Sequence, residues 1–159
     1  MDKTKIIETI VAQLERDLAR LKEAARATYE AATHEESKPE NEYDTRGLEA
    51  SYLAGAQSQR VAEIEELIFV YKQVKPRSFK DNQEIASTAL VEVDLDGKHS
   101  WVFIMPKGGG FTVTFSGKPI QIVSPSSPLG EALIGLSPGD VATVETGNQA
   151  REYEIISVE

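Results

Sequence analysis

The chain has 159 residues, of which 40% are hydrophobic, so it is long enough to fold around one sizeable core or two small ones. Its formal net charge is −9 and both halves are acidic, without the basic stripe that phosphate neutralisation on duplex DNA requires. It has no cysteine, which excludes disulfides, thiolate zinc sites and cysteine nucleophiles. No apolar run reaches the length of a signal peptide or a membrane span, so we expect a cytoplasmic protein that binds neither membranes nor duplex DNA.

Residues 5–33 carry apolar and small side chains at alternating steps of four and three. This spacing is a heptad pattern and predicts a long amphipathic helix with one packing seam. The seam positions are Ile7, Val11, Leu14, Leu18, Leu21, Ala25, Thr28 and Ala32.

Residues 44–74 show the same pattern, with seam positions at Gly47, Ala50, Ala54, Gln57, Val61, Ile64, Ile68 and Tyr71. Two such helices joined by a short connection predict an antiparallel helical hairpin over residues 1–75. Small residues cluster toward the joined ends, so the two helices are expected to form a thin finger there. Gly47 and Gly55 indicate either close packing or some fraying near the tip.

The hydrophobic period changes after Pro76, and this change marks the predicted domain boundary. The predicted second domain covers residues 80–159 and is rich in β-structure. Its expected strands are residues 85–94, 100–105, 111–115, 120–123, 141–145 and 153–158, with a short helix over 128–134. The predicted fold class is therefore α+β, with a helical hairpin followed by a β-rich domain.

The connection between the two helices, residues 34–44, concentrates negative charge. Its acidic residues are Glu35, Glu36, Glu40, Glu42 and Asp44, opposed only by Lys38. Pro39 prevents one helix from running through the segment. Carboxylates bind hard cations such as Mg²⁺, and an exposed loop is suited to completing a metal site on another molecule rather than building one alone. The competing interpretation is that Glu40 and Glu42 only stabilise the positive end of the second helix.

Other candidate sites are weaker. The glycine run 107–110 lacks the spacing of a phosphate-binding loop and favours a hairpin turn. His34 and His99 belong to different predicted domains, which argues against a joint metal site. Trp101 and Phe103 alternate with apolar residues in a predicted strand and are expected to belong to the core.

Two stretches resemble the bacterial Gre family of transcript cleavage factors. The first is Glu40-Asn41-Glu42-Tyr43, with Ala50, Gln57 and the run 61–65 after it, and it is similar to the family's tip and descending helix. The second is the serine- and proline-rich entry 124–128 into the run 129–135, with Pro138-Gly139-Asp140 and residues 151–155 after it, and it is similar to the family's closing segment.

The resemblance implies an N-terminal coiled-coil hairpin and a C-terminal FKBP-like domain. That domain would dock on RNA polymerase near its secondary channel, with the finger inserted into the channel. In the family, tip carboxylates help to hold a second magnesium ion and position the water that cuts backtracked RNA near its 3′ end. The implied protein is a monomeric transcription elongation factor that is not itself an enzyme. It binds no cofactor stably and shares Mg²⁺ with the polymerase active site.

We assign Glu36 and Glu40 as the metal carboxylates. Residues four apart are neighbours on a regular helix, and although Pro39 breaks that regularity, a turn can still bring the two side chains together. Glu35, Glu42 and Asp44 are the further catalytic candidates. With the tip anchored on Glu40-Asn41, Ser37 occupies the place of the family's first tip acid, and Glu36 stands one position away. This departure supports an alternative function, a Gre-like modulator or inhibitor that occupies the channel without cleavage. A third interpretation, a peptidyl-prolyl isomerase, follows only from the implied FKBP-like fold.

Overall fold

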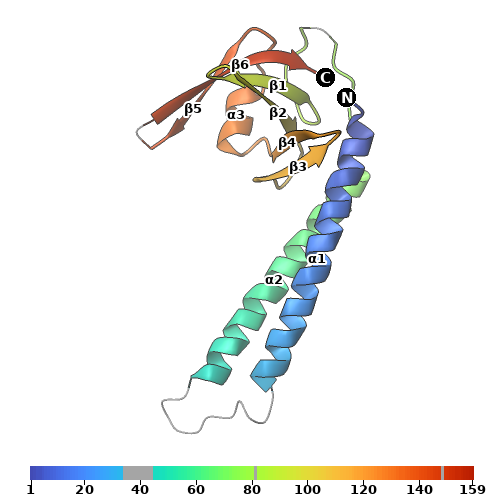
Figure 1. Cartoon of the computed structure of the whole chain (residues 1–159), viewed down its shortest axis with the longest axis vertical. Coiled ribbons are helices and arrows are strands. Elements are labelled where there is room, and N and C mark those ends of the chain that lie inside the picture. The colour runs from blue at the N-terminus through green and yellow to red at the C-terminus, as the bar shows by residue number, and fades with distance from the viewer. Residues whose placement is uncertain (34–44, 81, 148) are drawn as a thin grey trace. The chain divides into compact units, whose positions relative to one another are not determined.

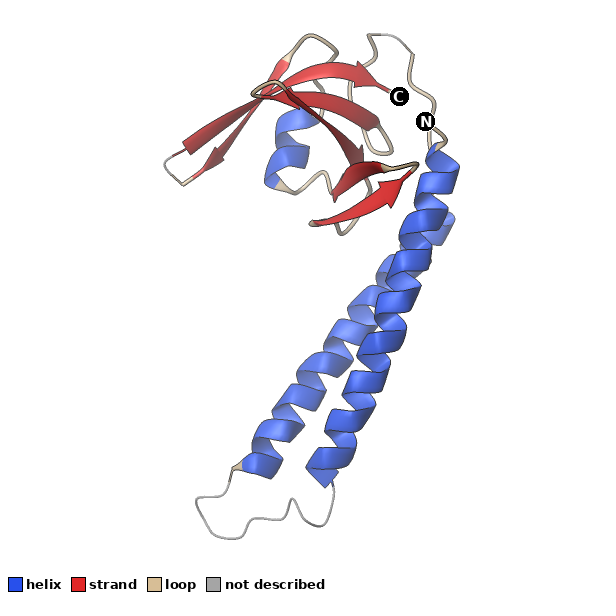
Figure 2. Ribbon diagram, viewed as in Figure 1, coloured by secondary structure: helices blue, strands red, loops and turns tan. Residues whose placement is uncertain are grey.

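The computed structural model describes residues 1–33, 45–80, 82–147 and 149–159 (Figure 1). The elements, in chain order, are α1 (Lys3–Thr33), α2 (Arg46–Gln73), β1 (Leu90–Leu95), β2 (Lys98–Ile104), β3 (Phe111–Phe115), β4 (Lys118–Val123), α3 (Pro128–Leu133), β5 (Val141–Thr146) and β6 (Gln149–Val158). Two long helices thus precede a sheet that carries one short helix (Figure 2), which confirms the predicted α+β class. No helix in these described ranges is long and apolar enough to cross a membrane.

The first strand starts later than predicted, and residues 85–89 lie outside it, although two of them still bond to β2: the Thr88 amide donates to the Ile104 carbonyl oxygen at 2.7 Å, and the Ile104 amide donates to the Ala89 carbonyl oxygen at 3.0 Å. The backbone amide of Ile85 donates to the carbonyl oxygen of Leu136 at 2.8 Å, and Gly135 donates back to Ile85 at 2.9 Å. Thr88 has a φ of 71°, in the left-handed region that interrupts an extended strand. The expected strand over 85–94 was therefore wrong at its start, and β1 begins only at Leu90.

Residues Val11–Phe69 form one compact unit, in which α1 and α2 lie side by side and antiparallel (Figure 1). The predicted seam is confirmed at its described positions in this unit. Its residues are buried or half-buried: Val11, Leu14, Leu18, Leu21, Ala25 and Thr28 of α1, and Gly47, Ala50, Ala54, Gln57, Val61, Ile64 and Ile68 of α2. A salt bridge of 2.6 Å between Lys22 Nζ and Glu65 Oε1 joins the two helices beside the seam. The spacing of apolar residues thus placed the packing faces correctly.

Gly55 is not required by helix packing. A Cβ atom built at Gly55 would meet no heavy atom within 4 Å, and the residue is exposed. Its neighbour Ala54 is the buried small residue of this region. The small side chain that matters for packing here is therefore Ala54.

The second compact unit contains a six-stranded sheet of order β3-β4-β2-β1-β6-β5. Neighbouring strands are antiparallel except for β2 and β4, which run parallel. One core consists of buried residues of the sheet together with Leu129 and Leu133 of α3. The sheet and loop members of this core are Ile85, Ala89, Val91, Val93, Val102, Ile104, Val123, Ala142 and Ile155. Alternation along β1 and β2 thus supplies the apolar side chains that α3 meets.

The other face of the sheet is also apolar near the start of β1. Leu90 lies opposite Phe103, and Phe103 lies opposite Ile122, so these fully buried side chains share one face. By its contacts, this unit also includes Met1–Ile10 and Val70–Glu159. The predicted domain ranges of 1–75 and 80–159 stay a prediction, but the ends of both long helices belong to the sheet's compact unit.

The first turns of α1 and the last turn of α2 are fixed by fully buried side chains, of which Ile6 and Ile10 lie outside the predicted seams and Tyr71 belongs to one. The Tyr71 hydroxyl donates to the carbonyl oxygen of Lys107 at 2.8 Å, and burial raises the pKa of this hydroxyl well above its usual value. Apolar burial and this long-range hydrogen bond therefore tie both helix ends to the sheet unit.

Lys3 makes a further tie. Its Nζ donates to the carbonyl oxygens of Arg77 and Thr88, and it lies 4.7 Å from the centre of the Phe79 ring. Burial lowers the pKa of Lys3 to about 8; Glu159 opposes this shift and Arg77 adds to it. In the unfolded chain the ordinary value of 10.5 applies. Between these two values the unfolded state binds more protons, so the contribution of Lys3 to stability rises with pH.

Replacing Lys3 by Met should therefore change stability in a pH-dependent way. We expect the free energy of unfolding of the parent to increase, relative to that of Lys3→Met, when the pH is raised from about 7 to about 10. Urea unfolding followed by fluorescence at both pH values measures this difference. Lys5→Met, which removes the same charge from an exposed position of α1, is the control. Equal pH trends for both variants would contradict the assignment.

Candidate functional site

The acidic connection lies between the two helices, since α1 ends at Thr33 and α2 begins at Arg46. All five predicted tip acids, Glu35, Glu36, Glu40, Glu42 and Asp44, lie outside the described residues, as does His34. Their assigned roles, including the metal role of Glu36 and Glu40, therefore stay predictions. What the structure does describe is the pair of helix ends that carry them.

The start of α2 has its own stabilising groups. The Thr45 hydroxyl donates to the Glu49 carboxylate at 2.9 Å, and the Glu49 amide donates to the Thr45 carbonyl oxygen at 2.9 Å. Glu49 is also the acidic residue of the first turn of α2, where a carboxylate favours the helix dipole. The start of α2 thus has a carboxylate of its own in Glu49, and the capping interpretation of Glu40 and Glu42 stays a prediction.

The distal half of the hairpin carries exposed apolar surface that the seam pattern did not predict. Tyr29 is 63% exposed and Tyr52 is 73% exposed, and Leu48 and Leu53 are also exposed. Beside Tyr29, a groove of about 300 Å³ runs between the helices. Its lining residues are Tyr29, Thr33, Ser51, Ala54, Gly55 and Ser58. The exposed residues Tyr29, Leu48, Tyr52 and Leu53 were missed because apolar residues outside the seam give no periodic signal, whereas Ala54 belongs to the predicted seam.

The loop before α3 is a tightly built turn. The Ser127 hydroxyl accepts from the Gly130 amide at 3.1 Å and donates to the Ser124 carbonyl oxygen at 2.7 Å. A Cβ atom on Gly130 would lie 1.9 Å from the Ser124 carbonyl oxygen, a distance that no real contact allows. The serines and the glycine of this sequence motif are thus explained by one backbone approach and one helix cap.

A polar cluster lies on the sheet surface at the far end of β1. His99 Nδ1 is 3.1 Å from a Glu92 oxygen, and His99 Nε2 is 3.3 Å from an Asp94 oxygen. Within the described ranges, no group of three or more His, Cys, Asp or Glu side chains has the geometry to hold a metal ion.

The two aromatic residues of β2 differ in burial. Trp101, expected in the core, is only half-buried and has Lys118 Nζ 5.2 Å from its ring centre, whereas Phe103 is fully buried as predicted.

A local cluster of positive charge begins in the last turn of α2, and it is hidden when net charge is taken over each half of the chain. Four cations and no carboxylate lie between Glu66 and Asp81. They are Lys72, Lys75, Arg77 and Lys80, and all four are exposed. We call residues 72–80 the cationic segment. Net charge taken over windows of ten residues identifies this segment.

The chain is similar to known transcription factors along almost its whole length. The family model described as transcription elongation factor, GreA/GreB, C-terminal matches residues 114–159. A transcription elongation factor GreA of Streptococcus agalactiae is 31% identical, over 92% of this chain and 89% of that protein. The GreA of Methylococcus capsulatus is 28% identical, over 99% of this chain and 98% of that protein.

A relative with a different printed role is similar to almost the same extent. The transcription inhibitor protein Gfh1 of Thermus thermophilus is 27% identical, over 95% of this chain and 91% of that protein. The similarity to both kinds of relative extends over more than nine-tenths of the chain and so includes the helical hairpin as well as the sheet unit. The chain therefore belongs to the GreA/GreB family of transcription factors.

Proposed function

We propose that the protein is an elongation factor that binds RNA polymerase at its secondary channel and stimulates cleavage of backtracked RNA. The observation that carries this proposal is the similarity to proteins named transcription elongation factor GreA over nearly the full chain. A match limited to the C-terminal region would support docking alone. A match that includes the hairpin also supports a function for the finger, and the inhibitor Gfh1 shares this match.

The dimensions of the hairpin suit this role. At 1.5 Å per residue, the 31 residues of α1 give a helix of roughly 46 Å, and the helices are held together by an apolar seam and the pair Lys22–Glu65. A paired helix of this length is stiff enough to bring a short acidic loop to a recessed active site. We propose that residues 1–75 act as this finger and that residues 80–159 dock on the polymerase.

The chemistry of the tip rests on carboxylate oxygens, which are the ligands that Mg²⁺ prefers. A shared magnesium ion would supply stabilisation of charge at the reacting phosphate and a more acidic water. Glu36 and Glu40 are proposed to face that ion, while Glu35, Glu42 and Asp44 keep the surroundings negative and are the alternative ligands. The protein thus acts on the polymerase's own cleavage reaction from within the cytoplasm and needs no stable cofactor.

The second candidate function is inhibition without cleavage. It is favoured by the similarity to the Thermus inhibitor Gfh1 and by Ser37 in the place of the family's first tip acid. Such a protein would use the same hairpin to occupy the channel. The two functions differ only in whether the tip positions a metal ion, so the RNA product discriminates between them.

The test uses purified full-length protein and stalled, backtracked elongation complexes in the presence of Mg²⁺ or Mn²⁺. We expect the RNA to become shorter at its 3′ end, and transcription to resume from the new end when nucleotides are added. Polymerase alone provides the rate of intrinsic cleavage. Slower elongation with no shortened RNA would instead establish the inhibitor, and no effect on either reaction would refute both functions.

A further inference from the structure

The cationic segment contrasts with the rest of this acidic chain. The chain has 26 acidic residues against 17 lysines and arginines, yet residues 72–80 contain four cations and no acid. In the described part of the chain, Lys75 and Lys80 have no carboxylate partner for their amino groups. Surface cations in a stable fold are usually interspersed with acids. This arrangement is therefore unusual for a surface that only keeps the protein soluble.

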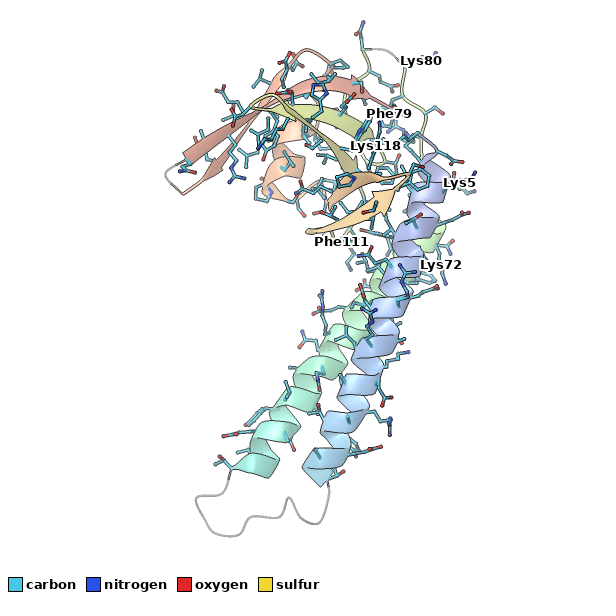
Figure 3. All side chains as sticks on the ribbon, viewed as in Figure 1. Lys5, Lys72, Phe79, Lys80, Phe111 and Lys118 are labelled. Carbon is cyan, nitrogen blue, oxygen red and sulfur yellow. The ribbon has the colours of Figure 1, made fainter. Side chains whose placement is uncertain are left out.

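The backbone of the segment is held in a fixed conformation. The Arg77 amide donates to the Thr88 hydroxyl oxygen at 2.9 Å, and the Arg77 carbonyl oxygen accepts from Lys3 Nζ. Two cations lie close to the Phe79 ring, with Lys3 Nζ 4.7 Å and Arg77 Cζ 5.4 Å from its centre. Figure 3 labels Lys72 at the end of α2, and Phe79 and Lys80 in the loop that follows. Lys75, Arg77 and Lys80 thus lie in a loop that is anchored at Arg77, and Lys72 lies in the last turn of the helix before it.

A further cation lies beside the cationic segment. Lys3 is half-buried next to Arg77, and its Nζ donates to the Arg77 carbonyl oxygen. Burial lowers the pKa of Lys3 most; the carboxylate of Glu159 raises it, and the positive charge of Arg77 lowers it by less. Lys3 therefore adds positive charge next to the segment.

We propose that the cationic segment is a docking surface for a carboxylate-rich patch on a partner protein. Resting on the proposed function, this partner is RNA polymerase, and the segment would add an ionic contact to the docking of the sheet unit. Charge complementarity supports this assignment, because clustered cations opposite clustered acids raise association rates and fix orientation.

A protein patch fits the segment better than a nucleic acid does. A nucleic acid presents a continuous line of phosphates, which would extend from the short cationic segment onto acidic surface. Binding of unpaired bases needs exposed aromatic rings, but Phe79 is half-buried and already has two cations close to its ring. A local patch of carboxylates on a protein meets neither difficulty.

The test compares two matched double variants of the full chain. Lys75→Gln/Lys80→Gln removes two charges from the segment. Lys98→Gln/Lys118→Gln removes two charges from exposed positions at the starts of β2 and β4 in the same unit. We expect the first pair to weaken binding to purified polymerase by about tenfold at low salt, with less loss at high salt, and the second pair to weaken it by less than about twofold. Equal losses for both pairs would overturn the proposal in favour of general attraction.

A second measurement does not depend on the polymerase. The ¹⁵N-labelled protein is titrated with an oligo-glutamate peptide and with single-stranded RNA of the same formal charge, and backbone amide shifts are mapped. We expect the peptide to shift residues 72–80 and to leave those around Lys98 and Lys118 unchanged. Shifts elsewhere, or tighter binding of the RNA at these lysines, would overturn the proposal. If the parent fails to bind polymerase but the peptide maps to the segment, the proposed function fails and the docking surface stands.

Discussion

Replacement of Glu36 and Glu40 together by Gln should reduce factor-stimulated RNA cleavage by about 100-fold or more, because both are proposed to contribute charge where the reacting phosphate is stabilised. Glutamine keeps the size and polarity of the side chain but cannot supply an anionic oxygen to a metal ion. Binding to the polymerase should change little, since the docking unit is untouched. Cleavage of backtracked complexes at saturating factor measures the first quantity, and competition with labelled parent protein measures the second.

The matched control is Glu23→Gln/Glu30→Gln. Both residues are exposed on the same half of α1, pair with Arg26, and lie outside the tip. Losing these surface pairs should cost little stability and leave cleavage unchanged. If the tip variant cleaves as fast as the parent, Glu36 and Glu40 are not the metal carboxylates, and Glu35, Glu42 and Asp44 become the next set to replace. A parent that cleaves under neither metal supports the inhibitor.

Replacement of Gly130 by Ala should destabilise the sheet unit by about 3 kcal/mol, near the upper end for overpacking a tight site. The new methyl group would lie 1.9 Å from the Ser124 carbonyl oxygen and 2.8 Å from its carbonyl carbon, both backbone atoms. Relief requires movement of the turn that Ser127 caps, with loss of its bonds to Ser124 and Gly130. The single tryptophan, Trp101, lies in β2 of this unit, so its fluorescence during urea unfolding reports the change.

Gly55→Ala provides a control of opposite sign. Gly55 is helical and a Cβ atom there has open space, so alanine should stabilise the hairpin by up to about 1 kcal/mol through helix propensity. Circular dichroism during thermal unfolding measures this gain, and the Trp101 transition should stay unchanged. If Gly130→Ala unfolds at the same urea concentration as the parent, the turn can accommodate the methyl group, and the close approach of Gly130 to Ser124 does not limit stability.

Much of the architecture follows from the sequence alone. The heptad spacing from Ile7 to Thr28 fixes which face of α1 is buried, because side chains three and four apart share one face of a helix. The alternation of Val91 and Val93 with polar residues likewise fixes the faces of β1. These patterns are local, so they can be recognised without knowing which other helix or strand packs against each element. The acidic run 34–44 and the family resemblance point to the tip in the same way, although its geometry lies outside the described residues.

The remaining features were decided by contacts between residues far apart in sequence. Ile85 is not in a strand because its backbone bonds with Gly135 and Leu136, and no local pattern encodes that pairing. The helix ends join the sheet unit because Tyr71 bonds to Lys107 and Lys3 bonds to Thr88. Periodicity identifies which side of a helix or strand is apolar. It does not identify the element that packs against this side, because that element can come from a distant part of the chain. Burial and hydrogen bonding over the whole tertiary structure decide which elements meet.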